Sequence, residues 1–248
     1  MYVKSLLITG ANRGIGLEFV KQFLKLPQSP QWVFAACRNP EKATDLKTLG
    51  ETYPNLRIKQ LEVTDRESIK DLVTSVTSDL GEEGLTLLIN NAGCLKRLQL
   101  NDVTQEEMLE SFQINSVAPL CISQAFVPVL KKSSLQSPGD GGYGYRAAIV
   151  NISTLTASIT DNVTGGNYDS RTSKAALNMI SKSLSVDLKP GRILVSILDP
   201  GWVKTELGGA GAKMEVSDSV ARMIKVIQGL TMDKTGTFLN YDGKTLPW

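Results

Sequence analysis

The sequence predicts an α/β fold in which a doubly wound, mostly parallel seven-stranded sheet carries helices on both faces. Short apolar or β-branched runs alternate with longer stretches of helical period along the chain, and no internal repeat is visible. A glycine-rich turn closes the first run and opens the first helical stretch, as in nucleotide-binding sheets. With 248 residues and 42% hydrophobic composition, the chain is expected to form one such domain, residues 1–248.

The expected elements follow from these runs in chain order. Strands are expected at residues 3–10, 31–38, 57–63, 85–90, 146–153, 192–201 and, more weakly, 236–240. Helices are expected at residues 15–26, 41–49, 66–79, 104–130, 170–188 and 217–229. A loop at 131–146, rich in Ser, Pro and Gly, is expected to be plain surface. A second flexible loop, 206–216, is expected to be a mobile wall of the site.

Composition excludes several functional classes. The 27 Lys and Arg against 25 Asp and Glu give a formal charge of +2, so nothing favours a nucleic acid or an anionic membrane as partner. The absence of histidine excludes Ser-His-Asp and Cys-His catalysis and most zinc hydrolase sites within this chain, so we expect no metal.

The cysteines and the apolar runs bear on the compartment. Cys37, Cys94 and Cys121 are an odd, widely spaced set among apolar neighbours, and we expect buried, reduced thiols. No apolar run approaches the roughly 20 residues needed to span a bilayer, and no cleavage signal follows the first residues. The sequence therefore predicts a cytoplasmic protein.

The turn "TGANRGIG", residues 9–16, is a candidate phosphate-binding site. Gly10, Gly14 and Gly16 remove side chains where the backbone must turn tightly and approach a pyrophosphate, while the following helix N-terminus supplies amide donors. The spacing is G-x-x-x-G-x-G rather than G-x-G-x-x-G. Taken alone, this glycine pattern is a weak signal.

Further motifs make the signal specific. "LLINNAG", residues 87–93, ends the fourth strand, and "IVNIS", "SKAALN" and "DPGWVKT" follow in order. Together with the glycine turn they resemble the short-chain dehydrogenase/reductase family, over nearly the whole chain. "DNVTGG" and "PGWVKTELGG" look most like the sniffer-type carbonyl reductases. The resemblance implies a Rossmann-type fold and hydride transfer from a nicotinamide cofactor to a carbonyl carbon.

Two arginines favour NADP(H) over NAD(H). NAD enzymes of this architecture usually carry an acidic residue after the second strand, but Arg38 stands there and no carboxylate precedes Glu41. Arg13 lies near the same ribose in the family. Guanidinium groups bind phosphate in a bidentate manner, so we expect both to hold the 2′-phosphate.

The family resemblance implies the remaining cofactor contacts. Glu62 and Val63 stand where the family binds adenine, with Glu in place of its Asp. Asn91 is expected to stabilise the sheet instead. The full set of expected cofactor residues is Gly10, Asn12, Arg13, Gly14, Ile15, Gly16, Arg38, Glu62, Val63, Asn90, Ala92, Gly93, Lys174, Pro200, Gly201, Val203 and Thr205.

The catalytic set of the family is matched at three positions of four. In the family, a Tyr donates the proton, a Lys four residues later lowers the Tyr pKa and binds the ribose, a Ser orients the carbonyl, and an Asn holds a water. Asn115, Ser153 and Lys174 match, but the Tyr position is Ser170. A serine hydroxyl is a far weaker acid than a phenol and is shorter by a ring.

Other tyrosines are poor substitutes for the missing phenol. Tyr168 lies six residues before Lys174, about 240° around a helix, and would point away unless the helix begins after it. Tyr143 and Tyr145 lie in the earlier loop and no motif supports them.

Three functions stay open from the sequence. The first is an NADPH-dependent carbonyl reductase impaired at Ser170, with a small apolar pocket for aldehydes, ketones or quinones. The second is a catalytically inactive NADP(H)-binding sensor or interaction protein. The third and weakest is another reaction on the same fold, such as epimerisation. Both a monomer and a homodimer are compatible with the resemblance.

Overall fold

The computed structural model describes residues 3–136 and 147–248. Its centre is a sheet of seven strands in the order β3-β2-β1-β4-β5-β6-β7, and every neighbouring pair is parallel. This confirms the expected fold class. The strands are β1 (Ser5–Thr9), β2 (Trp32–Cys37), β3 (Leu56–Gln60), β4 (Leu87–Asn90), β5 (Ala147–Ile152), β6 (Ile193–Asp199) and β7 (Phe238–Asn240).

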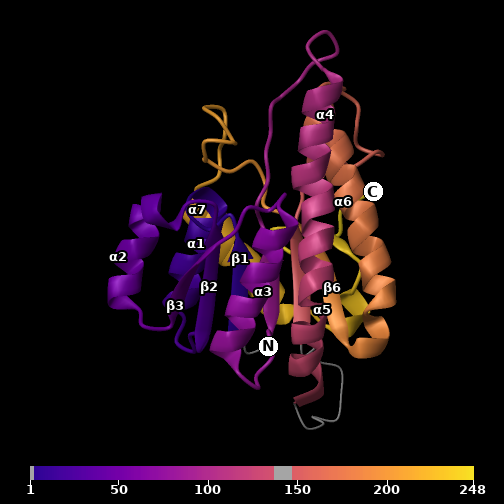
Figure 1. The fold of residues 1–248 in the computed structure, drawn as a ribbon. Coiled ribbons are helices and arrows are strands. Elements are labelled where there is room, and N and C mark those ends of the chain that lie inside the picture. Colours follow the sequence, from indigo (N-terminus) through magenta and orange to yellow (C-terminus); the bar gives the residue numbers. More distant parts are fainter. Residues whose placement is uncertain (1–2, 137–146) are drawn as a thin grey trace.

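Helices cover both faces of the sheet (Figure 1). Because side chains alternate along a strand, Leu6 and Ile8 pack on one face while Leu7 packs on the other. The first face is covered by α1 (Gly14–Leu24), α2 (Thr44–Thr52) and α7 (Val216–Gly229). The second is covered by α3 (Arg66–Leu80), α5 (Ala118–Gln136) and α6 (Tyr168–Asp187). Burial on both faces explains why the strands read as nearly continuous apolar runs.

Two expected helices are revised by the structure. The stretch expected as a helix at 41–49 begins as a 3₁₀ turn, Pro40–Lys42, and α2 starts only at Thr44. The stretch expected at 104–130 is α4 (Gln105–Phe112), a π-helical turn (Gln113–Val117) and α5. Pro119 has no N–H to donate to the carbonyl four residues earlier, which accounts for the wider turn before it.

The helical run 105–135 corrects another expectation. By length and composition it is apolar enough to cross a membrane, whereas we expected no such stretch from the sequence. Half of its most apolar window is buried inside the protein. Ile122, Phe126 and Leu130 belong to the core on the second face of the sheet. Core packing therefore accounts for the buried half of this window.

The strand order reverses between β1 and β4, which are hydrogen-bonded neighbours. The chain runs outward to β2 and β3 on one side, and later to β5, β6 and β7 on the other. At such a point the loops after the two strands leave in opposite directions and open a crevice at the carboxyl edge. Figure 1 shows the loops after β4, β5 and β6 leaving this edge, opposite the N-terminus.

Candidate active site

The glycine turn leaves no room for side chains. A Cβ on Gly16 would lie 2.3 Å from the Gly10 carbonyl oxygen and 2.6 Å from Asn91 Nδ2. Gly10 has a φ of +64° and packs against Ala92, whose Cα would lie 2.9 Å from an added Cβ. At Gly10 and Gly16, the turn after β1 therefore packs too closely against the end of β4 to admit a side chain.

The polar contacts of the turn leave its first helical amides available. Asn91 Nδ2 donates to the Thr9 carbonyl oxygen at 2.9 Å, and its backbone N–H donates to Thr9 Oγ1. Arg13 is the N-cap of α1 and makes no side-chain cap. Asn12 is exposed, and Ile15 packs against the core beneath the turn. The start of α1 can therefore receive an anion.

Both expected phosphate-binding arginines face carboxylates. Arg13 forms an ion pair with Glu206, and Arg38 Nε lies 4.0 Å from Glu62 Oε2. Glu62 Oε1 also accepts hydrogen bonds from the Thr64 N–H at 3.2 Å and hydroxyl at 3.0 Å. Because β3 ends at Gln60, Glu62 lies in the following loop, while Val63 packs against the core.

The four catalytic positions come from three segments and converge. Asn115 lies in the π-helical turn, Ser153 directly follows β5, and Ser170 and Lys174 lie one turn apart on α6. A Cβ on Gly93 would meet Asn115 Oδ1 at 3.0 Å and Lys174 Nζ at 3.5 Å. Gly93 is therefore the point around which the Asn and Lys side chains meet.

Asn115 is fully buried and fixed at both ends of its amide. Its Oδ1 accepts from the Cys94 N–H at 2.9 Å, and its Nδ2 donates to the Cys94 carbonyl at 3.0 Å and to Ser173 Oγ at 3.0 Å. Ser173 in turn donates to the Asp169 carbonyl oxygen at 2.6 Å. The π-helical turn is thus tied to both the loop after β4 and α6.

Lys174 is partly buried, and its ammonium group is directed at the backbone. Nζ donates to the Ile152 carbonyl oxygen at 2.8 Å. Burial lowers the pKa of Lys174 to about 8, and the nearby Cys94 thiol acts weakly in the opposite direction. The lysine therefore exchanges its proton at mildly alkaline pH.

Ser153 makes a side-chain hydrogen bond that the sequence did not predict. Its hydroxyl donates to Asn178 Oδ1 at 2.7 Å, and both residues are buried. Asn178 lies four residues after Lys174, on the same face of α6. The helical spacing in "SKAALN" was the available signal for this contact.

The donor position has only a serine hydroxyl. Ser170 is buried, four residues before Lys174. The expected helix start at residue 170 is two residues late, because α6 begins at Tyr168. Tyr168 therefore shares the helix with Lys174 at a separation of six residues, about 120° apart around the axis, and lies about 200° from Ser170, nearly opposite the donor position. Tyr143 and Tyr145 lie outside the described residues.

The side chain of Asn90 points away from the crevice. Its side chain is buried and donates to Asn151 Oδ1 at 2.8 Å and to Ser123 Oγ at 3.0 Å. An amide directed into the sheet leaves only the backbone of Asn90 at the crevice. Asn91, by contrast, binds the end of β1 as the sequence predicts.

The turn after β6 is held by a buried carboxylate. Asp199 accepts from the Leu155 N–H at 2.9 Å and the Gly201 N–H at 3.1 Å. Burial raises the pKa of Asp199, and these two hydrogen bonds oppose the rise. Asp199 thus joins the segment after Ser153 to the turn at Pro200 and Gly201, where Gly201 has a φ of +78°.

The segment after this turn has a defined path across the crevice. Val203 and Met214 form a β-bridge, and Thr205 Cγ2 lies 3.4 Å from where a Cβ on Gly14 would be. Trp202 is 57% exposed, and its Nε1 donates to the Gly208 carbonyl at 2.8 Å. Trp202 is therefore a surface support for the loop and no part of the core.

The cysteines are only partly as expected. All three are free thiols, and Cys37 is buried, but Cys94 and Cys121 are half-buried. Burial raises the pKa of the Cys94 thiol, which donates to Ser111 Oγ at 3.8 Å. Within residues 3–136 and 147–248, no cluster of three His, Cys, Asp or Glu side chains is placed to hold a metal ion.

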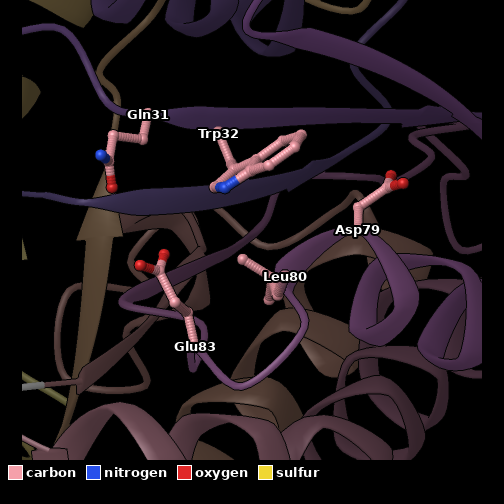
Figure 2. Close-up of a pocket in the computed structure, with 5 residues that line it drawn as sticks. All are labelled: Gln31, Trp32, Asp79, Leu80 and Glu83. Atoms are coloured by element: carbon pink, nitrogen blue, oxygen red, sulfur yellow. The ribbon is translucent and has the colours of Figure 1, made fainter.

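A surface pocket of about 470 Å³ lies at the opposite edge of the sheet (Figure 2). Gln31 precedes β2 and Trp32 begins it, while Asp79 and Leu80 end α3 and Glu83 follows that helix. Its carboxylates already pair with lysines, at 2.6 Å for Lys59 with Asp79 and 2.5 Å for Lys4 with Glu83. This pocket is remote from the convergent residues and does not belong to the candidate site.

Comparison with known proteins agrees with the fold. The family model for short chain dehydrogenases matches residues 4–215. The chain belongs to the short-chain dehydrogenase/reductase family and is by family an oxidoreductase.

Particular relatives lie among carbonyl reductases. The carbonyl reductase Sniffer of Drosophila melanogaster is 40% identical, with a TM-score of 0.96 over 99% of this chain and 100% of its own. An NADPH-bound carbonyl reductase from chicken fatty liver is 42% identical, with a TM-score of 0.94 over the full length of both chains. An uncharacterised oxidoreductase of Schizosaccharomyces pombe is 30% identical over 99% of this chain and 98% of its own.

Proposed function

We propose that the protein binds NADP(H) and belongs functionally to the carbonyl reductases, with its proton-transfer step impaired by Ser170. The observation that carries the proposal is that Asn115 and Lys174 meet at Gly93, while Lys174 also binds the Ile152 carbonyl oxygen next to Ser153, with a buried serine at the fourth position. Relatives that are carbonyl reductases, one of them NADPH-bound, support the substrate class and the cofactor.

The residues of the crevice fit a dinucleotide. The side-chain-free turn at Gly10, Gly14 and Gly16 and the uncapped start of α1 suit a pyrophosphate. Arg13 and Arg38 suit a 2′-phosphate, and β2 ends without a carboxylate to repel it. The backbone of Ala92 and Gly93 would lie next to the ribose, and Pro200, Gly201, Val203 and Thr205 would hold the nicotinamide end. The cofactor would supply the hydride.

The chain must supply position and a proton. Lys174 would hold the nicotinamide ribose, and the Ser153 hydroxyl would turn from Asn178 to donate to the carbonyl oxygen. Ser170 is too short and too weak an acid to replace a phenol. Loss of a general acid typically lowers the rate by about 10² to 10⁴, which is roughly 3 to 5 kcal/mol in the barrier.

A second candidate is a cofactor-binding protein without turnover. The Ser153 hydroxyl and the Lys174 ammonium already donate to Asn178 and Ile152. A site with these side chains bound to the protein, and with no phenol at residue 170, retains a binding crevice but lacks the family's proton donor. Such a protein would respond to the NADP(H) pool as a sensor or interaction partner.

The decisive experiment restores the phenol. NADPH oxidation is measured with a panel of aldehydes, ketones and quinones for the wild type, Ser170→Tyr and Ser170→Phe, the last as a ring without a hydroxyl. We expect Ser170→Tyr to raise kcat by about 10² or more while Ser170→Phe does not. Equal rates for the wild type and Ser170→Tyr would contradict the assigned role of this position.

The two candidates separate in the same assays. Weak turnover by the wild type identifies an impaired reductase. Tight NADPH binding without turnover on any carbonyl identifies a binding protein. Tyr168→Phe should leave any wild-type turnover unchanged, since Tyr168 lies about 200° around α6 from the donor position Ser170. A cytoplasmic location and a homodimer remain predictions.

A further inference from the structure

Arg13 and Glu206 form an ion pair that joins the two walls of the crevice. Arg13 precedes α1 in the glycine turn, and Glu206 directly follows Thr205 after β6. Their side chains are 61% and 75% exposed. Because Thr205 also lies beside Gly14, the pair closes the crevice from the cofactor side.

A second arginine holds the same segment from the substrate side. Arg97 donates to the Leu207 carbonyl oxygen, and its guanidinium lies 3.1 Å from where a Cβ on Gly209 would be. We call residues 206–209 the covering segment. Arg13 pairs with its Glu206, and Arg97 donates to the carbonyl oxygen of the next residue, Leu207.

We propose that Glu206 is a cofactor-specificity residue, which competes with the 2′-phosphate of NADP(H) for Arg13. This inference rests on the proposed NADP(H) function and adds a regulating contact to it. The phosphate must displace the carboxylate, which releases the covering segment on the cofactor side while Arg97 still holds it. NAD(H) has a hydroxyl at that position and leaves the ion pair in place.

Glu206, rather than Glu62, is the competing carboxylate. Glu62 lies 4.0 Å from Arg38, and Thr64 fixes it with two hydrogen bonds. Within the described parts of the chain, the Glu206 carboxylate is held by Arg13 alone. A side chain held at one exposed contact can swing away, whereas Glu62 stays beside Arg38.

The size of the effect follows from the exposure of the pair. Exposed ion pairs contribute little free energy, and salt screens them, so the competition should change affinity several-fold and not by orders of magnitude. Removing the carboxylate also removes its repulsion of the incoming phosphate. We expect Glu206→Gln to lower the Kd for NADP⁺ about three- to tenfold at low salt.

The test is calorimetric titration of the full chain with NADP⁺ and NAD⁺. Glu206→Gln should tighten NADP⁺ binding as stated and change NAD⁺ binding less than about twofold. The gain should shrink at high salt and disappear in an Arg13→Gln background. Glu215→Gln is the matched control, because Glu215 is an exposed carboxylate nearby that pairs with Lys204 instead. It should leave NADP⁺ binding unchanged.

Several outcomes would overturn the inference. An unchanged NADP⁺ Kd in Glu206→Gln, an equal gain for NAD⁺, or an equal gain in Glu215→Gln would each do so. A wild type that binds no NADP⁺ in these titrations would overturn the proposed function itself, so the two failures are distinguishable.

Discussion

Lys174 Nζ donates a 2.8 Å hydrogen bond to the Ile152 carbonyl oxygen, at the last residue of β5. The contact places a cation beside the strand end that precedes Ser153. In this position the ammonium group is removed from water. Burial therefore lowers the pKa of Lys174 from 10.5 to about 8. The protonation of this lysine is linked to the stability of the fold.

Lys174 should make the protein more stable as pH rises from about 8 to 10.5. In this window the unfolded chain binds the proton and the folded chain does not, so the free energy of unfolding increases with pH. The shift corresponds to at most about 3 kcal/mol. Urea unfolding at pH 7.5 and 10 should show a gain in the wild type relative to Lys174→Met. Lys182→Met, on the same helix, should keep the wild-type gain, and parallel behaviour of wild type and Lys174→Met would contradict the prediction.

Gly16→Ala should impair cofactor binding. The added methyl would collide with the Gly10 carbonyl oxygen and Asn91 Nδ2, both fixed by contacts between β1 and β4. Relief requires a shift of the turn, and we expect the Kd for NADP⁺ to rise more than about tenfold by calorimetry, since 1.4 kcal/mol suffices for that. Gly229→Ala, where nothing lies within 4 Å of the new Cβ, is the control and should bind like the wild type.

Asp199→Asn should destabilise the protein by about 1 to 3 kcal/mol. The carboxylate accepts one backbone N–H on each oxygen, and an asparagine amide would oppose one of these donors with its own. Urea unfolding measures the loss, and Asp71→Asn on the exposed side of α3 should cost less than about 0.5 kcal/mol. Equal stability of the two variants would show that the Leu155 and Gly201 contacts are unimportant.

Ser153 and Asn178 should be energetically coupled. Ser153→Ala leaves the buried Asn178 Oδ1 without the hydroxyl donor and should cost about 1 to 3 kcal/mol of unfolding free energy. A double-mutant cycle with Asn178→Ala should give a coupling of about 0.5 kcal/mol or more. Additive losses would mean that the hydrogen bond contributes nothing to stability.

The fold was predictable because its signals are local and repeated. Runs such as residues 85–90 and 192–201 are apolar on both faces of a strand, and the helical stretches between them require parallel pairing. The interruption at Gln113–Val117 was harder to foresee. A missing N–H at Pro119 permits a bend or a break as well as a π-helical turn, and packing decides among them.

The candidate site was predictable in its positions and less so in its contacts. Motif order predicts that Asn115, Ser153 and Lys174 lie together; in the structure, Asn115 and Lys174 meet at Gly93, and Lys174 binds the carbonyl oxygen of Ile152, the residue before Ser153. Partners distant in sequence, such as Asn178 for Ser153 or Glu206 for Arg13, depend on where loops and helices meet. The buried partners of the Asn90 side chain were likewise not predictable, because a motif does not tell which way an amide points.

The carboxylate of Asp169 links the loop on the substrate side of the crevice to α6. It accepts the N–H groups of Lys96 and Leu98 at 2.7 and 3.1 Å, on either side of Arg97. Two hydrogen bonds thus fix the loop that carries Arg97 to the first turn of α6, at the residue before Ser170. The loop that carries Arg97 should therefore move together with α6. A substitution that strains residue 170 and shifts the helix would also shift this loop.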